Sequence, residues 1–295
     1  MLAAPTAEPR VTWNVLRDIT QLFDFPFMVN AFRAGTAVAI TAGLVGWFMV
    51  LRKQSFAGHT LAVIGFPGAA GAVFLGLSAQ LGFFAFCLGG ALVIALLPRA
   101  GRSGFSEESA VIGTVQAFAL GAGFLFVSLY GGNLNGINAL LFGSIIGVTE
   151  GDVTRVVIAA AVAVVVIGVI GRPLLFASID PDVAGARGVP TRWVSIAFTV
   201  LLGLAAAASA EVTGALLVFA LLVLPAGTAQ SLTARPAVGL FLSVGLAVVI
   251  TWTGLAVAYY SPYPIGFWLT TFAFAVFLAA RGATGHRRRA QWQPA

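Results

Sequence analysis

Long apolar runs, each close to the length that crosses a bilayer, constrain the fold of this chain more than any other feature. They lie near residues 28–51, 58–79, 81–98, 108–130, 155–171, 193–209, 212–233, 237–260 and 264–280. A membrane-spanning helix takes about 20 apolar residues, and only 9% of the 295 residues are charged, against about 25% in soluble domains. The sequence therefore predicts an all-α polytopic membrane protein with about nine transmembrane helices, in a range of about eight to ten. No length remains for a sizeable soluble domain, which excludes an embedded ATPase.

Positive charge is divided unevenly between the loops that connect these runs. If successive loops alternate between the two sides of the membrane, twelve of the 16 Lys and Arg residues share the side of the C-terminus. The other four are Arg10, Arg17, Arg33 and Arg155. Because basic residues accumulate in cytoplasmic loops, we expect the N-terminus outside and the C-terminus in the cytoplasm. The net charge of +6 then reflects topology rather than nucleic-acid binding, although the basic run at residues 286–289 leaves a lipid or nucleic-acid patch as an alternative.

The chain divides into three predicted parts. Residues 1–26 lack the charged start and apolar core of a secretory signal. Within them Thr12, Leu16, Ile19 and Phe23 recur at helical spacing, with Val15 and Leu22 beside them. This pattern predicts an external amphipathic segment lying on the membrane surface. Residues 27–281 form the transmembrane domain, and residues 282–295 form a basic cytoplasmic tail.

Two ionisable residues fall at or near membrane depth, where a charge is costly and usually faces a cavity or a partner. His59 begins the second apolar run, and Glu211 lies between the sixth and the seventh. Both are candidate pathway residues. The structural alternatives are a neutral His59 imidazole hydrogen-bonded to backbone at a helix start and a Glu211 carboxylate solvated in a loop.

Two apolar runs contain proline near their middle. Pro67 and Gly68 interrupt the second run, and Pro225 interrupts the seventh. Each proline frees backbone carbonyls that must be satisfied by protein or by a water-filled cavity. Two such breaks are typical of a transporter pathway, whereas each one alone is also compatible with a packing kink.

The segment from Ala177 to Arg192 carries the clearest local signal. Asp180 suits the N-cap of a helix, Pro181 its first position, and Gly188 its C-terminal cap. The pattern predicts a two-turn helix in the cytoplasm. Such a helix suits docking onto another protein, and a tight connector is the alternative.

The sequence contains no catalytic motif. Walker-type G-x-x-x-x-G-K-[ST], H-E-x-x-H and G-x-S-x-G patterns do not occur, and the chain has only two histidines. Cys87 is the only cysteine, which excludes an intrachain disulfide and a cysteine-built zinc or iron–sulfur site. The chain is therefore predicted not to be an enzyme, and active transport would draw its energy from another chain or from an ion gradient.

Five motifs follow one another at specific separations. They are Arg52-Lys53-Gln54-Ser55-Phe56-Ala57-Gly58 with Phe66-Pro67-Gly68, then Ser106 to Gly113, Leu141 to Ser144, Asp180 to Gly188, and Gly214 to Val218 with Leu224-Pro225-Ala226. In this order, from about Phe27 to Arg281, the chain resembles the metal-ion family of bacterial ABC importer permeases. These are the membrane subunits of zinc, manganese and iron uptake systems.

The resemblance implies a homodimer with the translocation pathway at the subunit interface. It also implies two ABC ATP-binding subunits, which bind ATP and Mg, and an extracellular solute-binding protein that delivers the ion. The expected location is the bacterial plasma (inner) membrane. The helix at 180–188 would be the coupling helix seated in the ATPase, through Asp180, Pro181, Asp182, Ala184, Arg187 and Gly188.

One departure from the family pattern affects the expected metal site. Where the family usually reads Asp-Ala-Leu-x-His, this chain reads His59-Thr60-Leu61-Ala62-Val63. The carboxylate is lost and a single imidazole remains, which suits zinc, copper, iron or nickel better than a hard cation. Glu211 would supply an oxygen if it faces the same cavity.

The sequence thus predicts the permease subunit of an ATP-driven importer for a divalent metal ion, zinc or manganese first and iron after them. No cofactor of its own is expected. The alternatives are the same architecture importing a metal chelate or another small solute, and an ATP-independent carrier or channel. The scarcity of membrane carboxylates for proton or sodium coupling counts against the carrier.

Overall fold

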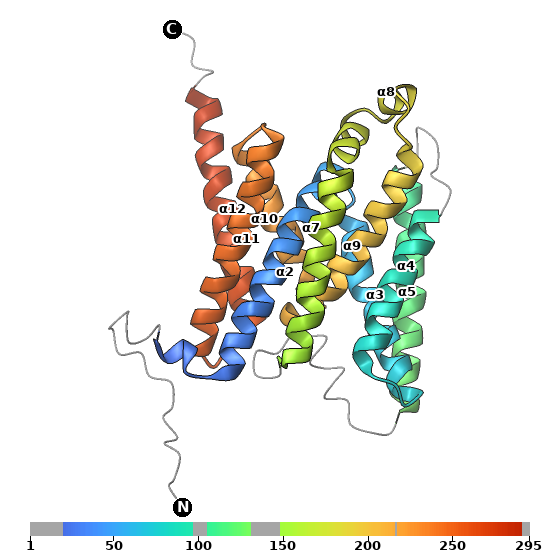
Figure 1. The fold of residues 1–295 in the computed structure, drawn as a ribbon, viewed down its shortest axis with the longest axis vertical. Coiled ribbons are helices and arrows are strands. Elements are labelled where there is room, and N and C mark those ends of the chain that lie inside the picture. Colours follow the sequence, from blue (N-terminus) through green and yellow to red (C-terminus); the bar gives the residue numbers. More distant parts are fainter. Residues whose placement is uncertain (1–19, 97–104, 131–147, 216, 291–295) are drawn as a thin grey trace, which may run out of the picture.

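The computed structural model describes residues 20–96, 105–130, 148–215 and 217–290, and its regular elements in these ranges are all helices (Figure 1). In chain order they are α2 (Pro26–Leu51), α3 (Ser55–Phe74), α4 (Ala79–Leu96), α5 (Phe105–Leu129), α7 (Glu150–Ile179), α8 (Pro181–Ala186), α9 (Thr191–Thr213), α10 (Val218–Leu232), α11 (Pro236–Tyr259) and α12 (Ile265–Ala290).

Eight helices of the described ranges are long and apolar enough to cross a membrane. α10 is apolar as well but has 15 residues, about 22 Å at 1.5 Å per residue, and is therefore shorter than the ~30 Å hydrocarbon core. The predicted all-α polytopic membrane fold, with about eight to ten spans, is confirmed.

The short α10 results from a turn that hydropathy does not reveal. α9 continues to Thr213, and Gly214 then adopts a φ of 80°, a conformation that glycine reaches without steric cost. α10 starts only at Val218. The predicted boundary between residues 209 and 212 was wrong because the residues on both sides of the true turn are equally apolar.

α2 lies at the centre of the bundle. It packs against α7, α9, α10 and α11. Within an 18-residue apolar stretch of α2, 72% is buried inside the bundle. α3, α4 and α5 form one flank, and α10, α11 and α12 form the other (Figure 1). The start of α2 and the end of α12 lie at opposite ends of the bundle (Figure 1).

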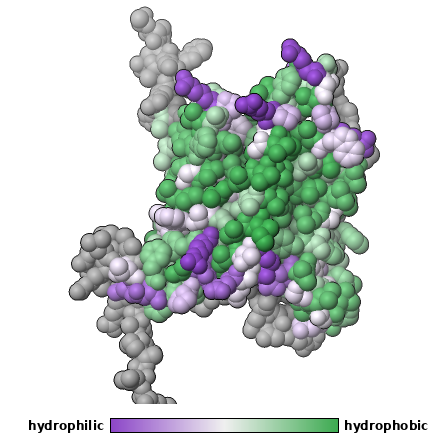
Figure 2. All heavy atoms as spheres, in the orientation of Figure 1, coloured by the Kyte–Doolittle hydropathy of each residue, from purple (hydrophilic) through white to green (hydrophobic). Residues whose placement is uncertain are grey.

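The outer surface carries an apolar band between two polar ends (Figure 2). Phe118, Phe241 and Val169 are among its most exposed side chains, with exposed fractions of 78%, 77% and 74%. Water would disfavour such a continuous apolar surface, whereas lipid acyl chains or another membrane subunit cover it favourably. The band therefore agrees with the membrane location expected from the sequence.

Small residues allow α2 to approach its neighbours closely. A Cβ atom built on Gly46 would overlap the carbonyl oxygen of Leu222 in α10, and one built on Gly43 would overlap the backbone of Val244 in α11. At the second contact, the buried Ser243 hydroxyl donates a 2.8 Å hydrogen bond to the Gly43 carbonyl. Close backbone packing of this kind replaces the hydrophobic drive that helices lack within lipid.

α7 begins earlier than the apolar run near residues 155–171. Glu150 and Asp152, which precede that run, belong to the first turn of α7. The Asp152 amide donates to the Thr149 hydroxyl at 3.3 Å, and the Thr149 amide donates to the Asp152 carboxylate at 2.8 Å. This reciprocal capping box satisfies two backbone donors that the helix itself leaves unpaired, so the helix starts earlier than the apolar pattern near residue 155.

The two terminal parts are described only in portions. Residues 20–23 are helical, with Leu22 buried, while the remainder of the predicted amphipathic segment, residues 1–19, lies outside the described residues. At the other end, the backbone of α12 continues to Ala290. The described part of the predicted tail thus extends the last helix.

Candidate functional site

His59 occupies the second turn of α3, against the first turn of α10. Its half-buried imidazole meets the Phe219 ring edge-to-face, with 5.4 Å between the ring centroids. The Nδ1 atom is buried and has no hydrogen-bond partner among the described residues. A buried polar atom without a partner is uncommon and costly. The alternative considered from the sequence, a hydrogen bond from the imidazole to backbone at the helix start, is not observed for this Nδ1 atom. An imidazole in this state suits a transient ligand such as a metal ion.

A polar pair follows directly on the neighbouring residue. The buried Thr60 hydroxyl donates a 2.8 Å hydrogen bond to the side-chain oxygen of Gln116 in α5. His59 therefore faces α10 while Thr60 faces α5. Gln116 was not among the sequence candidates, although a lone amide in the apolar run at 108–130 is the kind of residue that intramembrane polarity singles out.

A second intramembrane amide also went unnoticed in the sequence. The Gln230 side chain in α10 donates a 2.8 Å hydrogen bond to the carbonyl of Trp47 in α2. The two helices are thus tied together near the end of the bundle where α2 and α10 finish. This amide is satisfied by backbone, so its role here is structural.

The structure does not gather a metal-binding cluster around His59. Among the described side chains, no group of three or more His, Cys, Asp and Glu residues lies close enough to hold one ion. The backbone of Glu211 lies in the last turn of α9, and its side chain is outside the described residues. Leu202 of α9 borders Gly58, and Glu211 lies nine residues further, about 13 Å along the helix axis.

The two prolines do not break their helices. α3 runs from Ser55 to Phe74 through Pro67, and α10 runs through Pro225. The sequence expectation of interrupted helices was therefore wrong at the level of backbone structure. A single missing N–H is tolerated in a membrane helix when neighbouring helices pack around it, and both prolines are buried.

Gly68, directly after Pro67, lies where α3 and α4 pack closely together. A Cβ atom on Gly68 would overlap the carbonyl oxygen of Gly82 in α4, and a Cβ atom on Gly82 would overlap the carbonyl of Gly68. The two backbones thus touch directly just after the proline. This contact favours the packing explanation of the Pro67-Gly68 pair.

The predicted helix at the polar end of the bundle is present as α8. Asp180 is its N-cap and accepts a 3.0 Å hydrogen bond from the Val183 amide, with Pro181 at the first position. Gly188 adopts a φ of 80° beyond its end. This confirms the capping pattern that the sequence predicted.

α8 projects from the end of the bundle (Figure 1). Ala184 is fully buried, whereas Asp182, Val183 and Arg187 are exposed. α8 packs against α7 and α9, which flank it in the chain. Its exposed residues form a short helical surface of a size suited to a groove in another protein.

Arg52 ties the turn before α3 to both helices that flank α8. Its guanidinium donates to the Ser178 hydroxyl in the last turn of α7 at 3.2 Å and to the Ser195 hydroxyl in α9 at 2.8 Å. It also lies over the Phe198 ring, 5.5 Å from the centroid. The next residue, Lys53, has a left-handed φ of 58°. From the sequence, Arg52 contributed only to the charge count and to a motif.

Comparisons with known proteins place these features in context. Residues 24–282 match the model of a protein family described as the ABC 3 transport family. The chain is 29% identical over 266 residues to the chelated iron transport system membrane protein YfeC of Yersinia pestis, covering 90% of this chain and 89% of that protein. It is 27% identical over 235 residues to the manganese transport system membrane protein MntC of Halalkalibacterium halodurans, covering 80% of each.

A solved structure extends the likeness to three dimensions. The structure described as PsaBC from Streptococcus pneumoniae in complex with Fab contains a chain that matches with a TM-score of 0.79 at 26% identity. The match covers 90% of this chain and 95% of that chain. The arrangement of the helices is thus shared over nearly the full length of both.

Proposed function

Since this chain belongs to the ABC 3 transport family, whose relatives are metal transport membrane permeases, we propose that it is the permease subunit of an ATP-driven importer for a divalent metal ion. The match over residues 24–282 is the observation that carries this proposal. The chain is a multi-pass protein of the bacterial plasma membrane, in keeping with the eight membrane-length helices of its described residues. The working unit is proposed to be a homodimer that forms the pathway between its two copies.

The proposed cargo is zinc or manganese, with iron as a further candidate. The relatives named above are described as transporting manganese or chelated iron. His59 is the proposed pathway ligand, because its Nδ1 atom is buried and has no hydrogen-bond partner in the part of the chain that the structure describes. A sparse ligand set suits a pathway, since an ion that is held too tightly is not released.

Energy is proposed to come from a separate ATP-binding subunit that carries ATP and Mg. α8 is the proposed contact with this subunit, because it is short, capped at both ends and exposed except at Ala184. An extracellular solute-binding protein is proposed to deliver the ion to the opposite end of the bundle. Arg52 would pass movement of α8 to α3, because it contacts both helices beside α8 and lies just before α3.

The test is metal accumulation in cells that lack their own uptake systems. The chain is expressed with its ATP-binding and solute-binding partners, and zinc, manganese and iron are measured per cell. We expect selective accumulation of one ion, reduced by His59→Ala and unaffected by His286→Ala, which removes the other histidine of the chain. An assembled complex that accumulates none of the three ions would contradict the proposal.

A metal chelate is the second candidate cargo. The observation in its favour is the absence of a carboxylate partner for His59: the family's Asp/His pair is replaced by His59 and Val63. Uptake of free ions and of the same ions in chelated form separates the two candidates, because saturable free-ion uptake eliminates the chelate. Transport by the purified chain alone would instead support an ATP-independent carrier.

A further inference from the structure

A cavity of about 630 Å³ lies between α4 and α7, near the first turns of both helices. α4 and α7 each pack against α9, and Leu204 of α9 lines the cavity between them. This volume is within the ~300–1,000 Å³ of ordinary ligand pockets. The cavity is thus a groove with two helices as walls and a third as floor, and it is separate from His59 and α8.

The walls of the groove are apolar and open to the membrane. Leu81 of α4 and Ile158 and Val162 of α7 line it with exposed fractions of 67%, 57% and 41%. In a chain that spans the membrane, exposed apolar side chains at this depth contact lipid acyl chains. A lipid tail can therefore enter the groove from the side, without passing through water.

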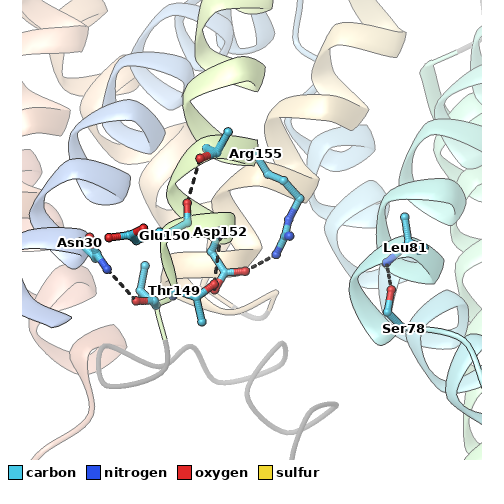
Figure 3. Close-up of polar contacts among 9 residues, drawn as sticks. Asn30, Ser78, Leu81, Thr149, Glu150, Asp152 and Arg155 are labelled. Atoms are coloured by element: carbon cyan, nitrogen blue, oxygen red, sulfur yellow. Dashed lines mark hydrogen bonds and ion pairs between the residues drawn. The ribbon is translucent and has the colours of Figure 1, made fainter. Parts of the chain in front are cut away.

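One end of the groove is polar and carries both signs of charge. Asp152 and Arg155 of α7 form an ion pair there, with exposed side-chain fractions of 17% and 43%. Ser78 and Gln80 at the start of α4 line the same end. Figure 3 shows the Arg155 side chain extending from α7 toward α4, with its guanidinium donating a hydrogen bond to the Asp152 carboxylate. A carboxylate and a guanidinium thus lie side by side at the mouth of an apolar groove.

The polar and apolar lining residues of α7 follow one stripe of that helix. Asp152, Arg155, Ala159 and Val162 are spaced by three or four residues, so they share a face, and all four line the groove. Along this stripe the lining changes from charged to apolar over ten residues, about 15 Å. This is the order of a phospholipid, with the headgroup at the membrane interface and the tail beneath it.

We infer that this groove binds one phospholipid whose headgroup carries both a phosphate and a primary ammonium. The phosphate is placed to accept hydrogen bonds from Arg155, and the ammonium to donate to Asp152. A lipid that has a phosphate but no ammonium places a negative headgroup near the Asp152 carboxylate and carries no positive charge to offset the repulsion. The groove therefore favours the zwitterionic lipid over a purely anionic one.

The test uses the full chain purified in mild detergent and read by native mass spectrometry, so it needs no metal, no ATPase and no transport. Phosphatidylethanolamine and phosphatidylglycerol with identical acyl chains are added in turn. We expect one phosphatidylethanolamine to be retained per chain, in preference to phosphatidylglycerol. Equal retention of the two lipids overturns the headgroup assignment, and retention of neither overturns the site.

Two pairs of variants locate the lipid. Ile158→Trp fills the groove and should abolish retention, whereas Val169→Trp, also on an exposed position of α7, should retain lipid as wild type does. Arg155→Gln should lower phosphatidylethanolamine retention about two- to fivefold, the range for an exposed ion pair, and Arg235→Gln at the other end of the bundle should not. Wild-type retention by Ile158→Trp overturns the inference.

A substitute variant and a cross-linking measurement cover misfolding of Ile158→Trp and coverage of the groove by a second copy of the chain. If Ile158→Trp does not elute as a folded species, Val162→Trp fills the same groove one turn further along α7 and takes its place. Ile158→Cys is also tested for disulfide cross-linking between copies, since Cys87 is buried and does not compete. A cross-link would show that a second copy of the chain covers the groove and would overturn the lipid assignment.

Discussion

The guanidinium of Arg52 donates a 2.8 Å hydrogen bond to the hydroxyl of Ser195, and this contact joins the α2–α3 turn to the first turns of α9. The same guanidinium reaches Ser178 at the end of α7. α8 lies between these two anchor points in the chain, and His59 lies seven residues after Arg52. Arg52 therefore links the start of α3 to the two helices that flank α8.

Arg52→Lys should lower the amount of metal transported per ATP hydrolysed. Lysine keeps the charge but lacks the forked geometry that reaches two hydroxyls at once, and each hydrogen bond to a charged group contributes about 1.5–3 kcal/mol. The ratio is measured with the complex reconstituted in vesicles. Lys53→Ala is the control, because it removes the neighbouring charge and leaves the Arg52 contacts in place. An unchanged ratio in Arg52→Lys would return the contact to a purely structural role.

His59→Ala should reduce metal-stimulated ATPase activity of the assembled complex and leave assembly intact. The imidazole is the proposed metal ligand, and its Nδ1 atom has no hydrogen-bond partner among the described residues, so the substitution breaks no such bond there. Stimulation is measured against zinc, manganese and iron concentration. Glu211→Gln should have the smaller effect, given its position about two and a half turns of α9 beyond Leu202. Unchanged stimulation in His59→Ala would remove this residue from the pathway.

Deletion of residues 180–188 should abolish association with the ATP-binding subunit, because it removes the exposed surface of α8. Asp180→Ala is the finer test: loss of the N-cap hydrogen bond to Val183 costs about 0.5–2 kcal/mol of helix stability and should weaken association without preventing insertion in the membrane. Co-purification of the two subunits measures both effects. Full association by the deletion variant would rule out α8 as the docking element.

Gly46→Ala should destabilise the bundle by at least about 1–3 kcal/mol, the usual cost of overpacking, because the new methyl group would overlap the Leu222 carbonyl. Backbone atoms of two packed helices have little freedom to move away. Gly245→Ala is the matched control: a Cβ atom there meets nothing within 4 Å, and alanine is the better helix former by about 0.5–1 kcal/mol. Thermal unfolding of the two variants in detergent should therefore shift in opposite directions.

Features that depend on neighbouring residues in the chain were predictable. The order of the apolar helices followed from hydropathy, and α8 followed from the Asp180-Pro181 start and the Gly188 end, since capping is a short-range interaction. The turn at Gly214 was missed, because the apolar residues around it hide the change of direction. Helix breaks at Pro67 and Pro225 were predicted and are absent, because the packing of other helices keeps α3 and α10 continuous.

The sequence by itself determined that the chain is a helical membrane protein, where most of its helices lie, and that it resembles the metal-ion permeases. These properties are local, since burial in lipid is decided by the composition of each run. Only the tertiary structure decided that Arg52 contacts Ser178 and Ser195 and that Thr60 pairs with Gln116. It also placed α4 and α7 on the two sides of a groove. Such pairings join residues far apart in the chain, and their geometry depends on how whole helices pack, which no single run of residues specifies.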